Sequence, residues 1–150
     1  MLKLQAKDAE DVQVISAVLQ DAIVPLVDIA WTPAEKHFVM VTQRLCRETE
    51  DHKLHRICCA VNMRGVESVQ TQGIDLNDRT RMLDLLMMTM EGNALHFVFA
   101  GGAQIKVKLG AWAMIIEDFG EAWPAGCEPC HDNLQLADLT KLNKKPNFRA

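Results

Sequence analysis

The fold of this chain follows from one segment, Leu95-His-Phe-Val-Phe-Ala-Gly-Gly-Ala-Gln-Ile-Lys-Val-Lys-Leu109. After the glycines, Ile105, Val107 and Leu109 alternate with polar residues. Two strand-like runs joined by Gly101-Gly102 are typical of a β-hairpin with a tight turn. The glycines do not form a phosphate-binding loop, because no Lys-Ser/Thr pair follows them and they join two strands. The segment therefore predicts an antiparallel hairpin.

Strand-like patterns continue on the N-terminal side of this hairpin. The predicted strands are residues 27–31, 38–45, 55–62, 66–72, 83–90, 95–100 and 105–109. Segment 38–45 is apolar on both faces for several residues. Arg64-Gly65 and Glu91-Gly92-Asn93 are predicted turns, and residues 73–81 are a predicted loop. The connections are too short for parallel crossovers, which need roughly a dozen residues, so the predicted sheet is antiparallel.

A helical pattern flanks the strands at both ends. Asp8 is a typical N-cap residue, and carboxylates follow it in the first turn. The helix predicted over residues 9–22 has an apolar face formed by Val12, Ile15, Val18, Leu19 and Ala22. A second helix is predicted between Gly110 and about Gly120. Its apolar stripe is Trp112, Ile115, Ile116 and Phe119.

These elements predict an α+β domain that is mostly antiparallel β. Seven strands followed by one amphipathic helix resemble the pleckstrin-homology-like barrel, in which a C-terminal helix caps a seven-strand barrel. The resemblance is one of element order over residues 25–120, and the N-terminal helix is an extra element. We predict a single domain over residues 1–126, followed by a tail over residues 127–150.

The composition argues against two classes of partner. The chain has 150 residues, of which 49% are hydrophobic and 24% are charged, so it can bury a core without metal or disulfide staples. Its formal net charge is −4, whereas nucleic acids and anionic membranes select clustered positive charge. Aromatic residues are 5% of the chain and leave little surface for base stacking. We expect no nucleic-acid partner and no membrane partner.

Three features predict a cytoplasmic protein. No apolar stretch of the kind found in signal peptides follows the basic start at Lys3. No apolar run reaches the length of a membrane span. The five cysteines are an odd set in which Cys58 and Cys59 are adjacent, unlike the disulfide framework of a secreted protein.

Four segments carry a resemblance to a known family. They are Leu2-Lys-Leu-Gln-Ala-Lys-Asp-Ala-Glu-Asp-Val-Gln-Val-Ile-Ser-Ala-Val-Leu-Gln-Asp-Ala22, Arg64-Gly-Val66, Phe97-Val-Phe-Ala-Gly-Gly-Ala103 and Asp118-Phe-Gly-Glu-Ala-Trp-Pro124. With them, residues 2–131 resemble the uncharacterised alphaproteobacterial domain-of-unknown-function family 2948. The resemblance implies no assigned activity and a gene context near histidine-biosynthesis genes. It also implies that Pro129 and His131 belong to the family pattern, whereas the two neighbouring cysteines do not.

One motif could carry chemistry, Cys127-Glu-Pro-Cys130-His131. Its spacing is that of c-type haem attachment, which normally takes place outside the cytoplasm. A thiol–disulfide pair needs nearby positive charge or a helix N-terminus, whereas Glu128 lies between these cysteines. As metal ligands, Cys127, Cys130 and His131 supply three of the four that a structural zinc site uses. The candidates for completing such a site are His52, His55, Cys58 and Cys59. The simplest interpretation is that these are ordinary tail residues.

Two other patterns have a structural interpretation beside the functional one. Cys59 and His55 share a strand face, so a nucleophile–base pair is conceivable. A cysteine among aliphatic residues has a raised pKa and is inert, which favours a core cysteine instead. His96 alternates with apolar neighbours and is predicted to face outward beside Lys106 or Lys108.

The leading hypothesis for function is a non-catalytic protein-binding or assembly module, because the sequence has no convergent acid/base set. Its partner is another protein or a second copy in a homodimer, and no cofactor is predicted. The alternative is a metal-binding or thiol-redox protein that uses Cys127, Cys130 and His131. A small enzyme whose residues meet only in space is a third interpretation.

Overall fold

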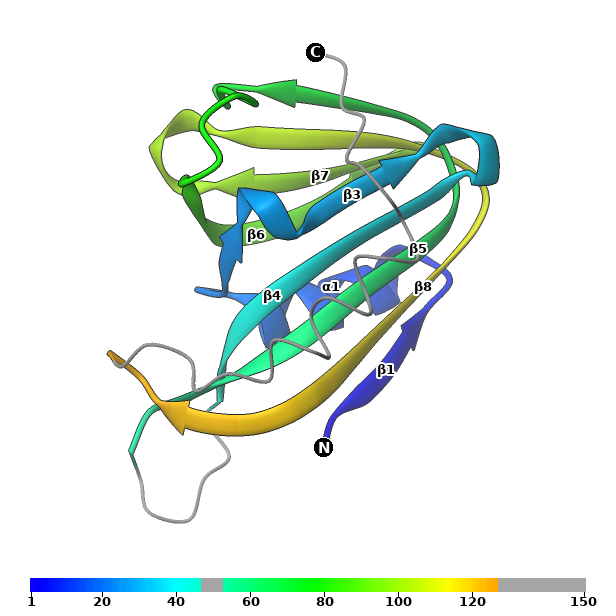
Figure 1. Cartoon of the computed structure of the whole chain (residues 1–150). Coiled ribbons are helices and arrows are strands. Elements are labelled where there is room, and N and C mark those ends of the chain that lie inside the picture. Colours follow the sequence, from blue (N-terminus) through cyan, green and yellow to red (C-terminus); the bar gives the residue numbers. More distant parts are fainter. Residues whose placement is uncertain (47–52, 127–150) are drawn as a thin grey trace.

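The computed structural model describes residues 1–46 and 53–126 (Figure 1). The elements in chain order are β1 (Lys3–Ala6), α1 (Ala9–Leu19), β2 (Ile23–Pro25), η1 (Leu26–Asp28), β3 (Ile29–Thr32), η2 (Pro33–Glu35), β4 (His37–Cys46), β5 (His55–Gln72), β6 (Met82–Glu91), β7 (Ala94–Phe99), η3 (Ala100–Gly102) and β8 (Gln104–Pro124). The η elements are single turns of 3-10 helix. The described part is thus mostly β with one α-helix, which confirms the predicted α+β class.

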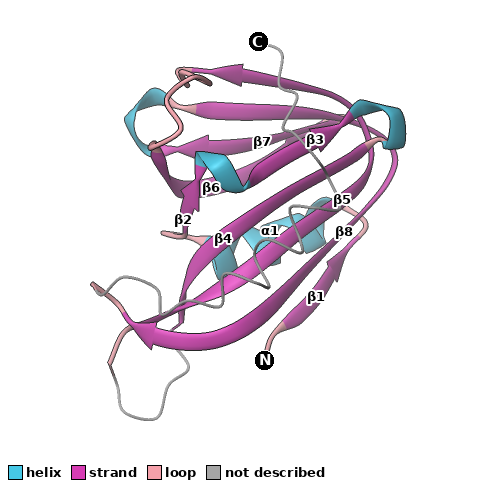
Figure 2. Cartoon of the chain, viewed as in Figure 1, coloured by secondary structure: helices cyan, strands magenta, loops and turns pink. Residues whose placement is uncertain are grey.

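The strands pair antiparallel throughout and close into a ring (Figure 2). The order around the ring is β8, β5, β4, β2, β6 and β7, and β7 pairs with β8 again. β7 pairs with the first part of β8, and β1 pairs with a later part. β3 pairs with β4 beside β2. The predicted antiparallel sheet and the hairpin across Gly101-Gly102 are therefore confirmed.

β5 and β8 bend together at one corner. Their register shifts on both sides of Val66. Gly65 lies at this corner with φ of 80°, and a Cβ atom there would overlap the carbonyl oxygen of Ala111. Glycine is required because it tolerates both the positive φ and the close approach of another main chain.

The turn predicted at Arg64-Gly65 is therefore wrong. The chain bends at this point without leaving the sheet, so the strands predicted over 55–62 and 66–72 form the single strand β5. The strand predicted over 83–90 and the hairpin turn after it are confirmed as β6 and its connection to β7.

The helix predicted over residues 110–120 is also wrong, because these residues belong to β8. Met114 and Ile116 are buried in the core, whereas Ile115 lies on the opposite face of the strand. Both edges of this part of β8 are paired, to β5 and to β1, so its main-chain groups are satisfied as a strand. Register irregularities before and after it disturb the two-residue period, and the remaining apolar spacing imitates a helix. The C-terminal cap that suggested a pleckstrin-homology-like arrangement is thus a strand.

The N-terminal helix is confirmed, with a different end. The Asp8 carboxylate accepts the main-chain N–H of Asp11 at 2.9 Å, which caps the helix as predicted. α1 ends at Leu19, three residues before the predicted end. Asp21 follows in a left-handed conformation with φ of 68°, which directs the chain into β2. Within the described residues, no helix is long and apolar enough to cross a membrane.

The core lies inside the ring. The hairpin of β7 and β8 contributes Leu95, Phe97, Phe99, Ile105 and Val107 to it. Phe38 of β4 packs against Phe97, with 5.9 Å between ring centroids. α1 adds Val12, Ile15 and Leu19. Val39 and Val41 of β4 face away from Phe38 and are buried as well, so the prediction that this strand is apolar on both faces is confirmed.

Candidate functional site

A groove of about 430 Å³ lies between α1 and β6. Its lining comes from both elements and consists of Ala9, Val12, Gln13, Ser16, Met87, Met88, Thr89 and Met90. α1 packs against β6 more extensively than against any other element, and Figure 1 shows it crossing the lower part of the ring. The groove combines apolar side chains with the main chain of a strand.

α1 forms its half of the groove because of its amphipathic pattern. While the most apolar face of the helix enters the core, the adjacent stripe of Ala9, Gln13 and Ser16 lies along β6. The Ser16 hydroxyl oxygen accepts the main-chain N–H of Met88 at 2.9 Å. This bond links helix to strand and satisfies a main-chain group that no strand pairs with.

β6 presents an open edge to this groove. Met82 to Asp84 pair with β2 on that edge, and Leu85 exchanges two main-chain hydrogen bonds there with Asp21 and Ala22, each 2.8 Å long. Beyond Leu85, the strand pairs only with β7 among the described residues. Met88 directs its N–H away from β7 and toward α1. Alternation along an antiparallel ladder directs the C=O of Met88 and the N–H and C=O of Met90 to the same side. Among the described residues, no main-chain partner bonds these three groups on that side.

A β-bulge places large apolar side chains beside the groove. The register between β6 and β7 shifts between Leu85 and Met87, which inserts Leu86 as an extra residue. Leu85 and Met88 remain buried, while Leu86 and Met87 are 44% and 46% exposed. Sequence reasoning missed this site. The sequence signal that could have indicated it is the run of Leu and Met over residues 83–90, in which apolar and polar residues do not alternate regularly.

The residues that line the groove are uncharged, and the charged side chains of the two elements that form it, α1 and β6, are all acidic. Residues 8–22 and 82–91 contain no Lys or Arg. Their carboxylates are Asp8, Glu10, Asp11, Asp21, Asp84 and Glu91. Because the whole chain has 16 Lys and Arg against 20 Asp and Glu, this bias is local and not a consequence of net charge.

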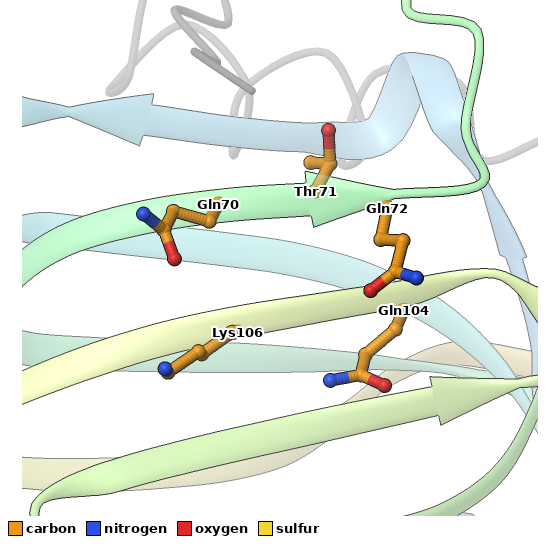
Figure 3. A pocket seen from close by; sticks show the side chains of 5 residues that line it. All are labelled: Gln70, Thr71, Gln72, Gln104 and Lys106. Atoms are coloured by element: carbon orange, nitrogen blue, oxygen red, sulfur yellow. The ribbon is translucent and has the colours of Figure 1, made fainter.

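A second concave surface lies on the outer face of β5 and β8. It has a volume of about 250 Å³, and Figure 3 shows the five lining side chains Gln70, Thr71, Gln72, Gln104 and Lys106. The Gln104 amide nitrogen lies 2.8 Å from His96 Nδ1. His96 pairs with Lys106 across the strands, which confirms its predicted outward position. Gln70, Gln72 and Lys106 are exposed and keep their hydration, so this surface offers less to a ligand than the apolar groove.

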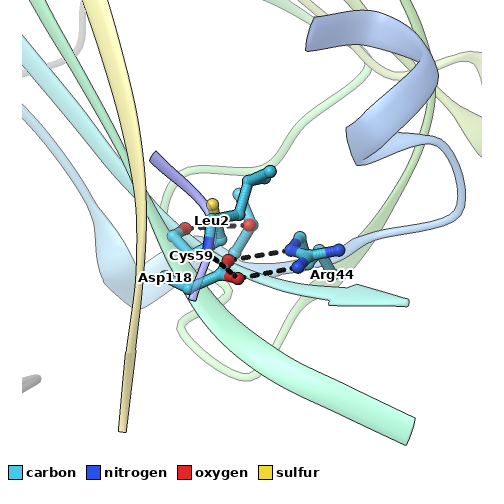
Figure 4. A network of polar contacts seen from close by, with 5 residues as sticks. Leu2, Arg44, Cys59 and Asp118 are labelled. Atoms are coloured by element: carbon cyan, nitrogen blue, oxygen red, sulfur yellow. Dashed lines mark hydrogen bonds and ion pairs between the residues drawn. The ribbon is translucent and has the colours of Figure 1, made fainter. Parts of the chain in front are cut away.

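A buried ion pair joins β4 to β8 inside the ring (Figure 4). Arg44 Nε donates to Asp118 Oδ1 at 2.8 Å, and Arg44 Nη2 donates to Asp118 Oδ2 at 2.7 Å. The main-chain N–H of Leu2 donates to the same carboxylate at 3.0 Å. This bond ties the residue just before β1 to β8, so the network stabilises the fold.

Cys59 lies beside this network and does not form a nucleophile–base pair with His55. Burial, followed by the charge of Asp118 and a hydrogen bond to it, raises the pKa of the Cys59 thiol far above its usual range. His55 is four residues away on the same strand, roughly 13 Å along its axis. Its Nδ1 atom lies 3.0 Å from the carbonyl oxygen of Lys53. The interpretation of Cys59 as a core residue is confirmed, and its low reactivity stays a prediction.

The predicted metal ligands Cys127, Cys130 and His131 lie outside the described residues, as does His52. Of the remaining candidates, Cys58 and Cys59 are adjacent on β5 and therefore point to opposite faces. Within residues 1–46 and 53–126, no group of three or more His, Cys, Asp or Glu residues could hold a metal ion. The metal-site prediction therefore depends on the segment beyond residue 126.

The fold and the groove define a mostly antiparallel α+β domain with an apolar, acidic-walled surface groove. A family model described as "Protein of unknown function (DUF2948)" matches residues 2–131, and the chain belongs to this family. The match confirms the predicted membership in family 2948 over the predicted residues. The same comparisons found no match among curated proteins or solved structures.

Proposed function

We propose that this chain is a non-catalytic protein-binding or assembly module of the bacterial cytoplasm, and that it binds its partner in the groove between α1 and β6. The observation that carries the proposal is the open edge of β6. Among the described residues, no other main chain bonds the C=O of Met88 or the N–H and C=O of Met90, and these groups lie next to exposed Leu86 and Met87. Addition of an extended segment to a strand edge is a common mode of peptide recognition, with main-chain bonds for affinity and side-chain pockets for specificity.

The side chains of the groove favour a protein partner over a small polar ligand. Three methionines line the groove within four residues, Met87, Met88 and Met90. Met88 is buried, whereas Met87 is exposed and Met90 is half-buried, so these two offer polarizable and unbranched side chains that adapt to a partner's shape. Gln13 and Thr89 add polar groups at the border of this apolar surface. An apolar centre with a polar border is the usual arrangement of a protein interface.

A capture experiment tests the proposal. Full-length protein is immobilised and used to retain proteins from an extract of its own host, beside the variants Met87→Ala and Met82→Ala. Met82 is 60% exposed on the same strand but does not line the groove, so it is a matched control. We expect one set of proteins to be retained by the native chain and by Met82→Ala, and roughly tenfold less by Met87→Ala.

Two outcomes contradict the proposal. One is equal retention of the same proteins by Met87→Ala, and the other is repeated captures without a consistent partner. Sedimentation equilibrium of the full chain separates the homodimer from a foreign partner. A dimer that Met87→Ala dissociates, and Met82→Ala does not, identifies a second copy as the partner.

A further inference from the structure

We infer that the segment bound between α1 and β6 is an extended peptide of a partner protein in which Lys or Arg flanks an apolar side chain that is not β-branched. This inference rests on the proposed function and adds the chemistry of the partner. It combines three properties of the groove, namely the charge of its walls, the direction of its open main-chain groups and the shape of its apolar lining.

The charge of the walls selects a basic partner. Neither residues 8–22 nor residues 82–91 contain a cation, and together they hold six carboxylates. The positive end of α1 lies near the groove at Ala9, and this end alone would favour an anion. It is already compensated, because Asp8 caps the helix and Glu10 and Asp11 lie in its first turn. The negative charge of the walls therefore prevails.

Two of these carboxylates are placed to meet a partner. Glu10 precedes Gln13 by three residues, so the two side chains are neighbours on the surface of α1. Gln13 lines the groove, and the Glu10 side chain is exposed. Glu91 follows Met90 directly on β6, and its exposed carboxylate lies 3.8 Å from His96 Nε2. The two residues lie on opposite walls, so cations on either side of a bound segment have a carboxylate within reach.

The main chain of β6 requires an extended partner. The C=O of Met88 and the N–H and C=O of Met90 face the groove, whereas Ser16 occupies the N–H of Met88. An added strand therefore pairs over a short stretch next to Met90. Since so few main-chain bonds are available, side chains must supply much of the affinity. Met87, which is 46% exposed, gives apolar contact, and a Leu or Met side chain, neither of which is β-branched, fits beside it.

Selection of peptides on the full-length chain tests this chemistry. A random twelve-residue peptide library displayed on phage is panned against the immobilised protein, and selected peptides are synthesised for fluorescence anisotropy. We expect enrichment of Lys or Arg next to Leu or Met. Affinity should fall about tenfold in Glu10→Lys and in Glu91→Lys, and rising salt should weaken it. Glu121→Lys, an exposed reversal of charge at the far end of β8, is the control and should leave affinity unchanged.

The outcomes separate this inference from the proposed function. If neutral or acidic peptides bind the native chain and lose affinity for Met87→Ala, the basic chemistry is overturned and the groove remains the binding site. Peptides whose affinity is unchanged in Met87→Ala overturn both the basic chemistry and the groove as the binding site. A synthetic peptide of residues 139–150, which carries four basic residues and no acidic one, serves as a competitor. Displacement by it at the affinity of the selected peptides would assign the groove to the chain's own C-terminal segment and overturn a separate partner.

Discussion

Arg44 and Asp118 form a two-bond ion pair whose side chains are 5% and 1% exposed. The pair joins strands that are 74 residues apart in sequence, and its carboxylate also receives the N–H of Leu2. Two charges removed from water are costly unless each is bonded, and here one guanidinium and one main-chain N–H supply the bonds. The pair therefore fixes the position of β1 and β4 relative to β8.

Loss of one partner of this pair should destabilise the protein strongly. Arg44→Met leaves the Asp118 carboxylate buried without its cation, and we expect a loss of about 3–5 kcal/mol in the free energy of unfolding. Urea denaturation measures it. Lys3→Met breaks the exposed pair of Lys3 with Glu117 on the neighbouring strand and should cost about 1 kcal/mol or less. Equal losses in the two variants would contradict the role given to Arg44. The double variant Arg44→Met/Asp118→Leu should recover much of the loss.

Gly65 should be far less replaceable than Gly92. Both have positive φ, but a Cβ at Gly65 overlaps the main chain of Ala111, whereas one at Gly92 meets nothing within 4 Å. We expect Gly92→Ala to cost about 1–2 kcal/mol from backbone strain alone. Gly65→Ala adds a steric conflict of a further 1–3 kcal/mol or so, since β5 and β8 must separate. Chemical denaturation of both variants compares them, and similar midpoints would contradict the corner geometry.

The contrast between these glycines also explains which parts of the fold were predictable. The hairpin from Leu95 to Leu109 and the cap at Asp8 depend on neighbouring residues, so their patterns could be interpreted directly. Gly65 lies at a bend within a strand. The bend depends on the close approach of β8, whose contacting residue is more than 40 residues away in sequence. A local pattern cannot distinguish such a bend from a turn.

The candidate site was hidden for the same reason. The bulge at Leu86 depends on how β6 registers with β7, and the groove depends on where α1 lies against them. Likewise, the spacing of Trp112, Ile115 and Ile116 imitated a helix, although pairing with β1 and β5 on both edges makes this segment a strand. Long-range pairing overrides local periodicity at each of these positions.

Asp28 should make stability depend on pH in an unusual direction. Burial raises its pKa from 3.8 to about 6, so the folded chain binds this proton more tightly than the unfolded chain. Its contribution to stability is therefore present below about pH 4 and is lost as the pH rises to about 6. Asp28→Asn removes the charge and should gain roughly 1–2 kcal/mol at neutral pH, after allowance for partial exposure. Unfolding free energies measured from pH 4 to pH 7 check this, and parallel curves for the two proteins would contradict it.

The metal-binding alternative makes a separate prediction. If Cys127, Cys130 and His131 hold a structural zinc, protein purified without an affinity tag should contain about one zinc per chain. The variant Cys127→Ser/Cys130→Ser should lose it, and a chelator should lower the melting temperature of the native chain alone. Elemental analysis and melting curves measure both effects. Much less than one zinc per chain, with melting unchanged by the chelator, eliminates this alternative.

Cys59 should resist alkylation while the protein is folded. The thiolate is the reactive form, and burial and the Asp118 carboxylate both oppose it, so the pKa is raised. Raising the pH from 7 to 9 accelerates alkylation of ordinary thiols, but for Cys59 the rate should stay low until the chain unfolds. Mass spectrometry of the peptide after iodoacetamide treatment measures this, with protein in guanidinium as the fully labelled reference. Rapid labelling of Cys59 in the folded chain would restore it as a candidate nucleophile. Slow labelling, together with fast labelling in Arg44→Met, would show that the ion pair holds the interior closed around the thiol.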